Sequence, residues 1–370
     1  MKGVFNKFLF AAMLFALSAA ATAQDIVVGQ SAPLTGGNAA FGADIRDGAL
    51  AYFKKVNDAG GINGRSIRLE TLDDKNDAKL SGPNAKQLIE QKGAVALFGF
   101  ASSTLSLPAM PAVKANKVPF FAPFTGADTI RKQGEYVYTT RVTYADEIEK
   151  LIGFWAPLGV TKVLVLHYDD EVGKQNFQTV ERALMKYQKV PTSLAIKRNA
   201  DLPADIAKRI IAADPQIILA TTLAAPIIQI RRQLTSLNKP YSITSLSFAS
   251  LGQIQSELGG DAAGITVALT VPPPNKVDIP VVAECAAAWN AAGQSRPMTT
   301  TALEACISAK VLVAGMRRAG NPTRGSLHKA LSSIGRVNVG GIDIAFRPGF
   351  NHGGTYVDIA IIRRNGELRV

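Results

Sequence analysis

The sequence predicts an α/β fold of two doubly wound lobes, and three observations support this class. Short apolar runs with the length of buried strands alternate with segments in which apolar residues recur at helical spacing. This alternation forms one series up to residue 142 and a second series that begins near Tyr144. The consecutive prolines at 272–274 then make a stiff break where the chain can cross between lobes. Strands that alternate with helices indicate parallel sheets covered on both faces.

The first series contains four predicted strands, and the helix after the first strand has a clear apolar face. Ile45, Ala49, Tyr52 and Val56 recur along that helix, which we expect to end at Gly60–Gly61, because glycine accepts the left-handed conformation of a helix end. The predicted strands of this series are residues 26–29, 67–72, 95–98 and 118–122.

The second series is followed by a mixed C-terminal region. Its predicted strands are residues 163–166 and 217–220, and its helical faces lie within 148–155, 177–187 and 206–211. Two further helices are expected near 281–291 and 301–319. The end of the chain, 342–370, is predicted to form strands with turns at 348–349 and 365–366.

The N-terminus has the pattern of a secretory signal peptide in residues 1–23. Lys2 and Lys7 precede an apolar run at 8–21, and Ala21-Thr22-Ala23 has the small-x-small form of a cleavage site. The apolar run is shorter than the roughly 20 residues that span a membrane. We therefore expect cleavage after Ala23 and a periplasmic protein.

Composition and motifs exclude several classes of function. The 47% hydrophobic and 19% charged residues of this 370-residue chain supply enough apolar material for two lobes. The formal net charge is +12, but the lysines and arginines are scattered, which argues against a nucleic-acid partner. Phosphate-binding, zinc-protease and nucleophile-elbow motifs are missing, and the three histidines lie far apart in sequence. We expect no enzymatic activity, cofactor or bound metal.

Two features allow a structural and a functional interpretation. Cys285 and Cys306 lie on successive predicted helices, so an oxidising compartment permits a disulfide, while two buried free thiols are the alternative. Asp73-Asp74 follows a strand and could bind a cation. Carboxylates in a turn more often cap helices, and with Asp77 nearby we favour the capping role.

Two loops are candidates for ligand binding. Residues 99–104 and 123–126 each follow a predicted strand, and ligands of open α/β sheets bind at the carboxyl ends of parallel strands. Serine hydroxyls and free backbone amides at a helix start favour a carboxylate. Ordinary helix capping by Ser and Thr is the structural alternative.

Several long stretches resemble the type I periplasmic binding proteins of the leucine/isoleucine/valine-binding family. They include IVVGQSAPLTGGNAAFGADIRDGALAYFKKVNDAGGINGRSIRLETLDD, ALFGFASSTLSLPAMPAVKANKVPFFAPFTGADTI, VLVLHYDDEVGKQNFQTVERAL and RAGNPTRGSLHKAL. The resemblance implies two Rossmann-like lobes joined by three crossovers, near 141–143, 270–272 and 345–348. It places lobe 1 at 24–142 plus 272–346 and lobe 2 at 143–271 plus 347–370.

The resemblance also implies which residues contact a ligand. By position, Ser103 donates its hydroxyl to a carboxylate, and Phe124 and Gly126 supply backbone groups. The family often has Thr at the Gly126 position, and Thr125 could take its place. The full set of ligand-binding candidates is Leu34, Phe41, Ser102, Ser103, Phe124, Thr125, Gly126, Tyr144, Glu171, Val172, Leu223 and Leu246.

The second lobe departs from the pattern of amino-acid binders. Val172 and Leu223 stand where tyrosines are usual, and the stretch around Leu246 lacks the acid that holds the ammonium group. A shifted alignment could give that role to Glu171. Because a buried ammonium without a counter-charge is costly, small organic carboxylates, aromatic ones included, are an alternative to an amino acid as the ligand.

The resemblance implies a monomer that closes its lobes over a branched-chain or related amino acid and then meets a membrane ABC permease. A binder of small organic carboxylates for such a permease is the first alternative. A ligand sensor of the same fold is an alternative. A periplasmic hydrolase is a further alternative, but no histidine is placed near its candidate serines.

Overall fold

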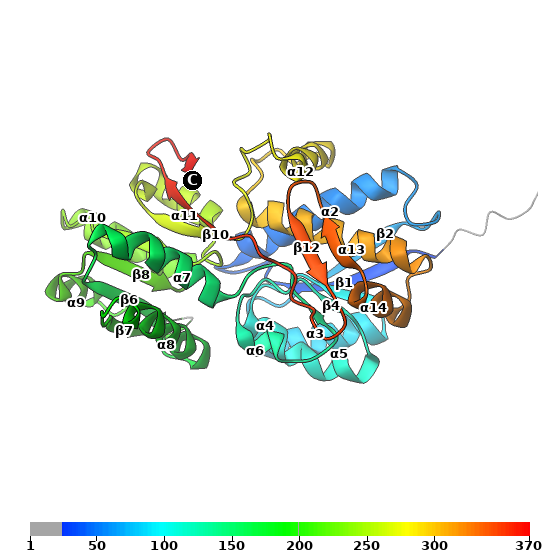
Figure 1. Ribbon diagram of the computed structural model, residues 1–370, viewed down its shortest axis with the longest axis horizontal. Coiled ribbons are helices and arrows are strands. Elements are labelled where there is room, and N and C mark those ends of the chain that lie inside the picture. Colours follow the sequence, from blue (N-terminus) through cyan, green and yellow to red (C-terminus); the bar gives the residue numbers. More distant parts are fainter. Residues whose placement is uncertain (1–23, 199) are drawn as a thin grey trace, which may run out of the picture.

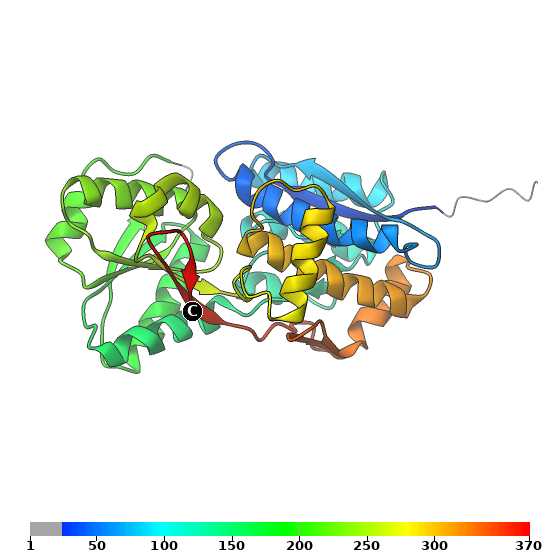
Figure 2. The ribbon, with the colours of Figure 1, turned by 90° about the horizontal axis from the view of Figure 1, so that it is seen from above.

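The computed structural model describes residues 24–198 and 200–370, and the predicted signal peptide lies outside these residues. Two lobes lie next to each other along the long axis of the molecule (Figure 1). We call the lobe that contains the N-terminal series of strands and helices the first lobe, and the other the second lobe. The same arrangement is visible from above in Figure 2, where the connections between the lobes lie close together.

The first lobe contains a five-stranded parallel sheet in the order β2-β1-β3-β4-β5. Alternate residues of each strand enter different apolar clusters, as expected for a sheet covered on both faces. Val28 and Phe98 face one cluster, whereas Val27 and Leu97 face the other. The strands are β1 (Ile26–Ala32), β2 (Ile67–Asp73), β3 (Ala96–Phe98), β4 (Phe120–Phe121) and β5 (Val137–Tyr138).

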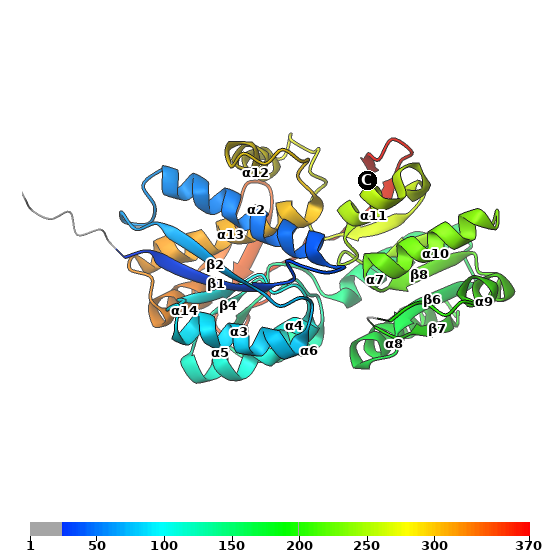
Figure 3. The ribbon, with the colours of Figure 1, turned by 180° about the vertical axis from the view of Figure 1, so that it is seen from behind.

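Helices cover both faces of this sheet, as seen from behind in Figure 3. One face packs against α2 (Ala39–Asp58), α12 (Pro280–Ala291), α13 (Thr300–Ala319) and α14 (Arg324–Ser332). The other face packs against α3 (Ala78–Glu90) and the helical run α4 (Ser103–Ser106), η1 (Leu107–Ala109) and α5 (Met110–Asn116). The short helix α6 (Asp128–Arg131) and the hairpin of β11 (Gly335–Asn338) and β12 (Asp343–Phe346) complete the lobe.

The second lobe contains a seven-stranded sheet in the order β14-β13-β10-β9-β8-β6-β7. Five strands pair in parallel, and at one edge β13 pairs antiparallel with β10 and β14 pairs antiparallel with β13. The strands are β6 (Val163–Tyr168), β7 (Thr192–Ile196), β8 (Ile217–Thr221), β9 (Ser242–Ser245), β10 (Thr266–Leu269), β13 (Asp358–Ile362) and β14 (Leu368–Arg369).

Helices again cover both faces, so the predicted doubly wound α/β class is confirmed. One apolar cluster lies under α7 (Tyr144–Trp155), which continues into η2 (Ala156–Leu158), and under α8 (Glu171–Met185). The opposite cluster lies under α9 (Ile206–Ala213), α10 (Ala224–Ser236) and α11 (Leu251–Leu258), which continues into η3 (Gly259–Ala262).

The chain passes between the lobes after β5, after β10 and after β12. In the third passage, Asn351 accepts a hydrogen bond from the amide of Thr139, and the amide of Gly353 donates to the carbonyl of Thr139. Residues up to Gly353 therefore lie against the first lobe, some way beyond the 345–348 expected for this crossover. The lobe bounds 24–142 plus 272–346 and 143–271 plus 347–370 stay a prediction.

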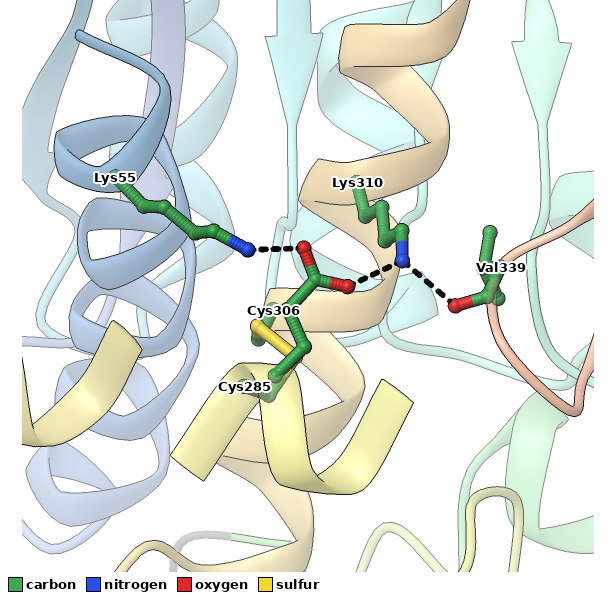
Figure 4. Close-up of a disulfide and its surroundings, with 6 residues drawn as sticks. Lys55, Cys285, Cys306, Lys310 and Val339 are labelled. Carbon is green, nitrogen blue, oxygen red and sulfur yellow. Dashed lines mark hydrogen bonds and ion pairs between the residues drawn. A yellow bond between two sulfur atoms is a disulfide. The ribbon is translucent and has the colours of Figure 1, made fainter. Parts of the chain in front are cut away.

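A disulfide joins Cys285 of α12 to Cys306 of α13, which decides between the two alternatives that the sequence left open (Figure 4). Next to it, the carboxylate of Glu284 forms ion pairs with Lys55 of α2 and Lys310 of α13. Lys310 also donates to the carbonyl of Val339 at 2.8 Å. The disulfide and these ion pairs fasten three helices of the first lobe together.

None of the helices within 24–198 and 200–370 combines the length and the apolar character needed to span a membrane. In the same residues, no cluster of His, Cys, Asp or Glu side chains has the arrangement of a metal site.

Candidate ligand-binding site between the lobes

The carboxyl ends of the parallel strands of both lobes border the space between the lobes. A cavity of ≈ 210 Å³ is lined by Gly126 of the first lobe and Val172 of the second. A larger cavity of ≈ 600 Å³ is lined by Lys75 of the first lobe and by Lys197 and Leu223 of the second. Because loops of both lobes form each cavity, a molecule bound here would contact both lobes at once.

The loop after β3 contains two serines with different roles. Ser102 is the N-cap of α4, and its hydroxyl accepts a hydrogen bond from the amide of Leu105 at 3.2 Å. The carbonyl of Ser102 accepts from Ser106. Ser103 is the first residue of α4 and is 3% exposed, yet its hydroxyl has no hydrogen bond to any described residue. Its hydroxyl group is therefore free for a ligand, whereas that of Ser102 is engaged in the cap.

The loop after β4 is packed against the start of α7. The Thr125 hydroxyl lies 3.1 Å from the hydroxyl of Tyr144 and accepts from the amide of Ala127 at 3.1 Å. The carbonyl of Gly126 accepts from the amide of Tyr144 at 3.0 Å. These contacts use the Thr125 side chain to position α7, so this hydroxyl is already engaged within the protein rather than free for the ligand-binding role suggested by the sequence.

Two further first-lobe candidates lie behind the loops. Phe41 is buried in α2, and its ring meets that of Phe124 edge to face at 6.2 Å. Leu34 is half-buried in the loop after β1, and its amide donates to Asp73 at 2.9 Å. Phe124 itself is buried and its amide donates to the carbonyl of Phe100 at 2.8 Å, so a contribution of its backbone groups to ligand binding stays a prediction.

Besides Tyr144, the second lobe contains four candidates that do not share one environment. Glu171 is exposed at the start of α8 and accepts a hydrogen bond from Gln175 at 2.7 Å. Val172 lines the smaller cavity, and Leu223, at the N-cap of α10, lines the larger one. Leu246 is fully buried in the apolar cluster under α7 and α8, so its side chain packs inside the lobe.

A buried acid that the sequence reasoning missed lies beside the loop of Leu246. Glu147 of α7 is completely buried, and its carboxylate accepts from the amide of Ser247 at 2.8 Å and from the hydroxyl of Ser247 at 2.9 Å. The signal in the sequence was a glutamate within the apolar face of the helix at 144–155. That position is unusual, because unpaired acids are almost never buried.

Arg141, in the first connection between the lobes, is the centre of a buried polar network. Its Nε and Nη2 atoms donate to both carboxylate oxygens of Glu304 at 2.8 and 2.7 Å. Thr270, in the second connection, donates to the same carboxylate at 3.0 Å. The guanidinium also lies 5.6 Å from the centre of the Phe124 ring. The ion pair of Arg141 and Glu304 therefore contacts both connections through Arg141 and Thr270, and it contacts the loop after β4 through Phe124.

Burial dominates the electrostatics of this network. Burial raises the pKa of Glu147 to about 7, although the positive charge of Arg141 and the hydrogen bonds from Ser247 act to lower it. Burial acts to lower the pKa of Arg141, but the charge of Glu304 outweighs this and holds it above the ordinary value. Burial likewise raises the pKa of Tyr144.

Comparison with known proteins agrees with this architecture. A family model described as periplasmic binding protein matches residues 25–367. The Leu/Ile/Val-binding protein homolog 1 of Brucella abortus (strain 2308) is 36% identical over 110 residues. That match covers 30% of this chain and 29% of the length of the relative.

Solved structures match over nearly the whole chain. A substrate-binding periplasmic protein from Ralstonia solanacearum has a TM-score of 0.88 and 31% identity, covering 93% of this chain and 99% of that chain. A fatty acid ABC transporter substrate-binding protein from Thermomonospora curvata has a TM-score of 0.82. Its identity is 18%, covering 93% of this chain and 91% of that chain, and this likeness concerns the fold alone.

The expectation of a non-enzymatic binding protein agrees with the family, whose members bind substrates rather than transform them. One conclusion follows from the two lobes with one large sheet each, the strand ends that border the interlobe cavities, and the family match over residues 25–367. This chain belongs to the periplasmic binding protein family and has the type I fold of its Leu/Ile/Val-binding members.

Proposed function

We propose that this protein captures a small carboxylate between its lobes and delivers it to a membrane ABC permease. The observation that carries the proposal is the hydroxyl of Ser103, which is held at the carboxyl end of β3 without a protein partner. A hydroxyl that donates to a charged carboxylate forms a stronger hydrogen bond than one between neutral groups, so a ligand carboxylate would be favoured at this position. Thr125 is bonded to Tyr144 and Ala127, and Ser102 accepts from the amide of Leu105, whereas the Ser103 hydroxyl forms no bond to the described residues.

We favour an organic acid over a zwitterionic amino acid. An α-ammonium group needs an acid close to the bound carboxylate. Glu171 is exposed and Leu246 is buried in the core, so neither predicted position supplies it. Glu147 is fully buried, and both of its carboxylate oxygens bond to Ser247. The Thermomonospora curvata relative shows by its name that a carboxylate without an ammonium suits a protein of this fold.

A branched-chain amino acid is the second candidate. It is favoured by the Brucella relatives, which are named Leu/Ile/Val-binding protein homologs. In that case the ammonium would be held by backbone carbonyls of the loop at 123–126 rather than by an acid. The mechanism is the same for both ligands: the ligand joins the first lobe, and the second lobe closes over it because the closed form binds it more tightly.

Thermal unfolding with a ligand panel tests the proposal. The panel contains leucine, isoleucine and valine, together with benzoate and aliphatic acids. A ligand at about a hundred times its Kd adds about 2.7 kcal/mol, which raises the Tm by several degrees. We expect Ser103→Ala to weaken binding of a responding acid by about tenfold or more, because a hydrogen bond to a charged group is worth about 1.5–3 kcal/mol.

Ser236→Ala is the matched control, because Ser236 is exposed on α10 and bonds only within its own helix. Equal affinity of the Ser103→Ala variant and the wild type would refute the role of this hydroxyl. A response to amino acids but not to the corresponding acids without an ammonium would reverse our choice of ligand class.

A further inference from the structure

Two lysines from opposite lobes line the ≈ 600 Å³ cavity between the lobes. Lys75 follows β2 of the first lobe, and Lys197 follows β7 of the second. Neither ammonium group forms an ion pair with any residue that the structure describes. The cavity is also lined by amide side chains of Asn38, Asn76 and Gln229, which can donate hydrogen bonds to an anion.

The two carboxylates that precede Lys75 fix the backbone of the turn in which it lies. The amide of Lys75 donates to Asp73 at 2.9 Å, and the amide of Asn76 donates to Asp74 at 3.0 Å. Lys75 and Asn76 have φ values of 52° and 60°, a left-handed conformation that is costly for residues other than glycine. The Asp73-Asp74 pair therefore has a structural role, which is to hold the tight turn that carries Lys75.

These carboxylates form hydrogen bonds within the first lobe and no ion pair with the Lys75 ammonium group. The second oxygen of Asp73 accepts from the Thr35 hydroxyl at 2.6 Å, and that of Asp74 accepts from the Ser31 hydroxyl at 2.9 Å. Each carboxylate is thus bonded through both oxygens to its own lobe. The Lys75 ammonium group therefore has no direct partner among the described residues, and it can contact a ligand in the cavity that Lys75 lines.

The adjacent basic residues Lys197 and Arg198 of the second lobe differ in their contacts. Arg198 donates to Asp170 at 2.6 Å, and its guanidinium lies 3.8 Å from the centre of the Tyr168 ring. Lys197 has no such partner and lines the cavity. The one acidic residue of the lining is Asp201, so two lysines and one aspartate give the lining a formal charge of +1.

Closure of the lobes would bring the two ammonium groups together. Like charges at short range oppose closure, and an anion between them would reverse the effect. We propose that the region between Lys75 and Lys197 is a subsite for a second acidic group, so that the ligand is a dianion such as a dicarboxylate. This inference rests on the proposed capture of a carboxylate at Ser103 and narrows its ligand class.

The strand order sets the size of this ligand. Ser103 follows β3 and Lys75 follows β2, and β1 lies between these two strands in the sheet. Neighbouring strands are about 4.8 Å apart, so the two subsites are separated by roughly 10 Å along the sheet edge. An extended aliphatic dicarboxylate of medium length, such as suberate, matches this separation, with the flexible lysine side chains adjusting the remainder.

A charge exchange in the unliganded protein tests the subsite without knowledge of the natural ligand. Lys75→Glu places a protein carboxylate opposite Lys197 and so imitates the acidic end of a ligand. The distance between the lobes is measured with spin labels on introduced exposed cysteines of α3 and α10. We expect the ratio of closed to open molecules to rise about two- to fivefold, the range of an exposed ion pair.

The double variant Lys75→Glu/Lys197→Glu restores two like charges, and we expect it to return to the wild-type ratio. Lys79→Glu is the control, because Lys79 is an exposed residue at the start of α3 that does not line the cavity. If Lys75→Glu gives the same ratio as Lys79→Glu, the subsite is refuted.

Suberate and octanoate give the matching ligand test, because they have the same number of carbon atoms and differ in one carboxylate. Stronger stabilisation by suberate, lost in Lys75→Met/Lys197→Met, supports the subsite. Equal stabilisation by both acids, abolished by Ser103→Ala, refutes the second anionic group while the proposed carboxylate capture stands.

Discussion

Replacing Glu147 by glutamine should change the pH dependence of stability in a defined direction. The carboxyl of Glu147 is completely buried, and burial raises its pKa from 4.5 to about 7. The groups that face it are Arg141 of the first connection, Glu304 of α13 and Ser247 of the loop after β9. Glutamine keeps the size and one acceptor oxygen but cannot ionise.

The sign follows from proton binding. Between pH 4.5 and about 7 the folded protein holds a proton on Glu147 that the unfolded chain releases. The free energy of unfolding therefore falls as pH rises through this window, and it is flat for this group below and above it. Moving a pKa from 4.5 to about 7 corresponds to about 3 kcal/mol, because each tenfold change in proton binding is worth about 1.4 kcal/mol.

Urea unfolding at pH 5, 6, 7 and 8 measures this effect. From pH 5 to pH 8 we expect Glu147→Gln to gain up to about 3 kcal/mol in unfolding free energy relative to the wild type. The other buried acids, such as Asp74 with its pKa raised to about 6, titrate in both proteins and cancel from the difference. Glu149→Gln, on the exposed face of the same helix, is the control. A difference between Glu147→Gln and the wild type that is constant from pH 5 to pH 8 would show that Glu147 does not titrate in this window.

Two further predictions concern stability. The disulfide joins Cys285 and Cys306, which are separated by 21 positions in the sequence, so replacing both by serine should lower the free energy of unfolding in urea by about 3 kcal/mol. A reducing agent should then destabilise the wild type but not the variant, and equal destabilisation of both proteins would contradict this prediction. Arg141→Met leaves the buried Glu304 without its partner and should cost about 3–5 kcal/mol, whereas Arg141→Met/Glu304→Met should recover much of this in thermal unfolding. A double variant as unstable as the single one would show that packing, rather than the unpaired charge, causes the loss.

The fold was predictable where apolar periodicity is strong. Strands such as β1, β6 and β8 are buried along their whole length, and their continuous apolar runs predicted them directly. β7 and β9 were not predicted, because TSLAI has only three consecutive apolar residues and SITS has a single one. Both join the sheet through backbone pairing with a strongly predicted neighbour, which single-strand patterns cannot reveal.

The candidate site was predictable only in part, because sequence position does not fix which hydrogen bonds a side chain makes. Both serines of the loop after β3 looked alike in sequence, but Ser102 caps α4 while the hydroxyl of Ser103 is free. Thr125 was expected to be available, yet it bonds to Tyr144, nineteen residues away. Glu147 and Ser247 are a hundred residues apart, so no local pattern connects them.

The departure at Gly126 is coupled to the start of α7. A Cβ atom at this position would lie 2.7 Å from both the amide nitrogen and the Cδ1 atom of Tyr144. A threonine, the residue that the resembled family often has, would therefore require a different path for the chain at Tyr144. The hydroxyl pair of Thr125 and Tyr144 stabilises the path that is present.

This coupling leaves the loop after β4 little freedom to select a ligand, because Thr125 and Gly126 are committed to packing against α7. In the proposed binding mode, selectivity then comes from Ser103 and from the larger cavity, which is lined by Lys75 and Lys197. Specificity by charge also needs no tight fit, because an uncharged ligand end would leave two desolvated ammonium groups without a partner on closure. In this proposal, a ligand end without a negative charge is rejected because it makes closure of the lobes unfavourable, and not because its shape does not fit.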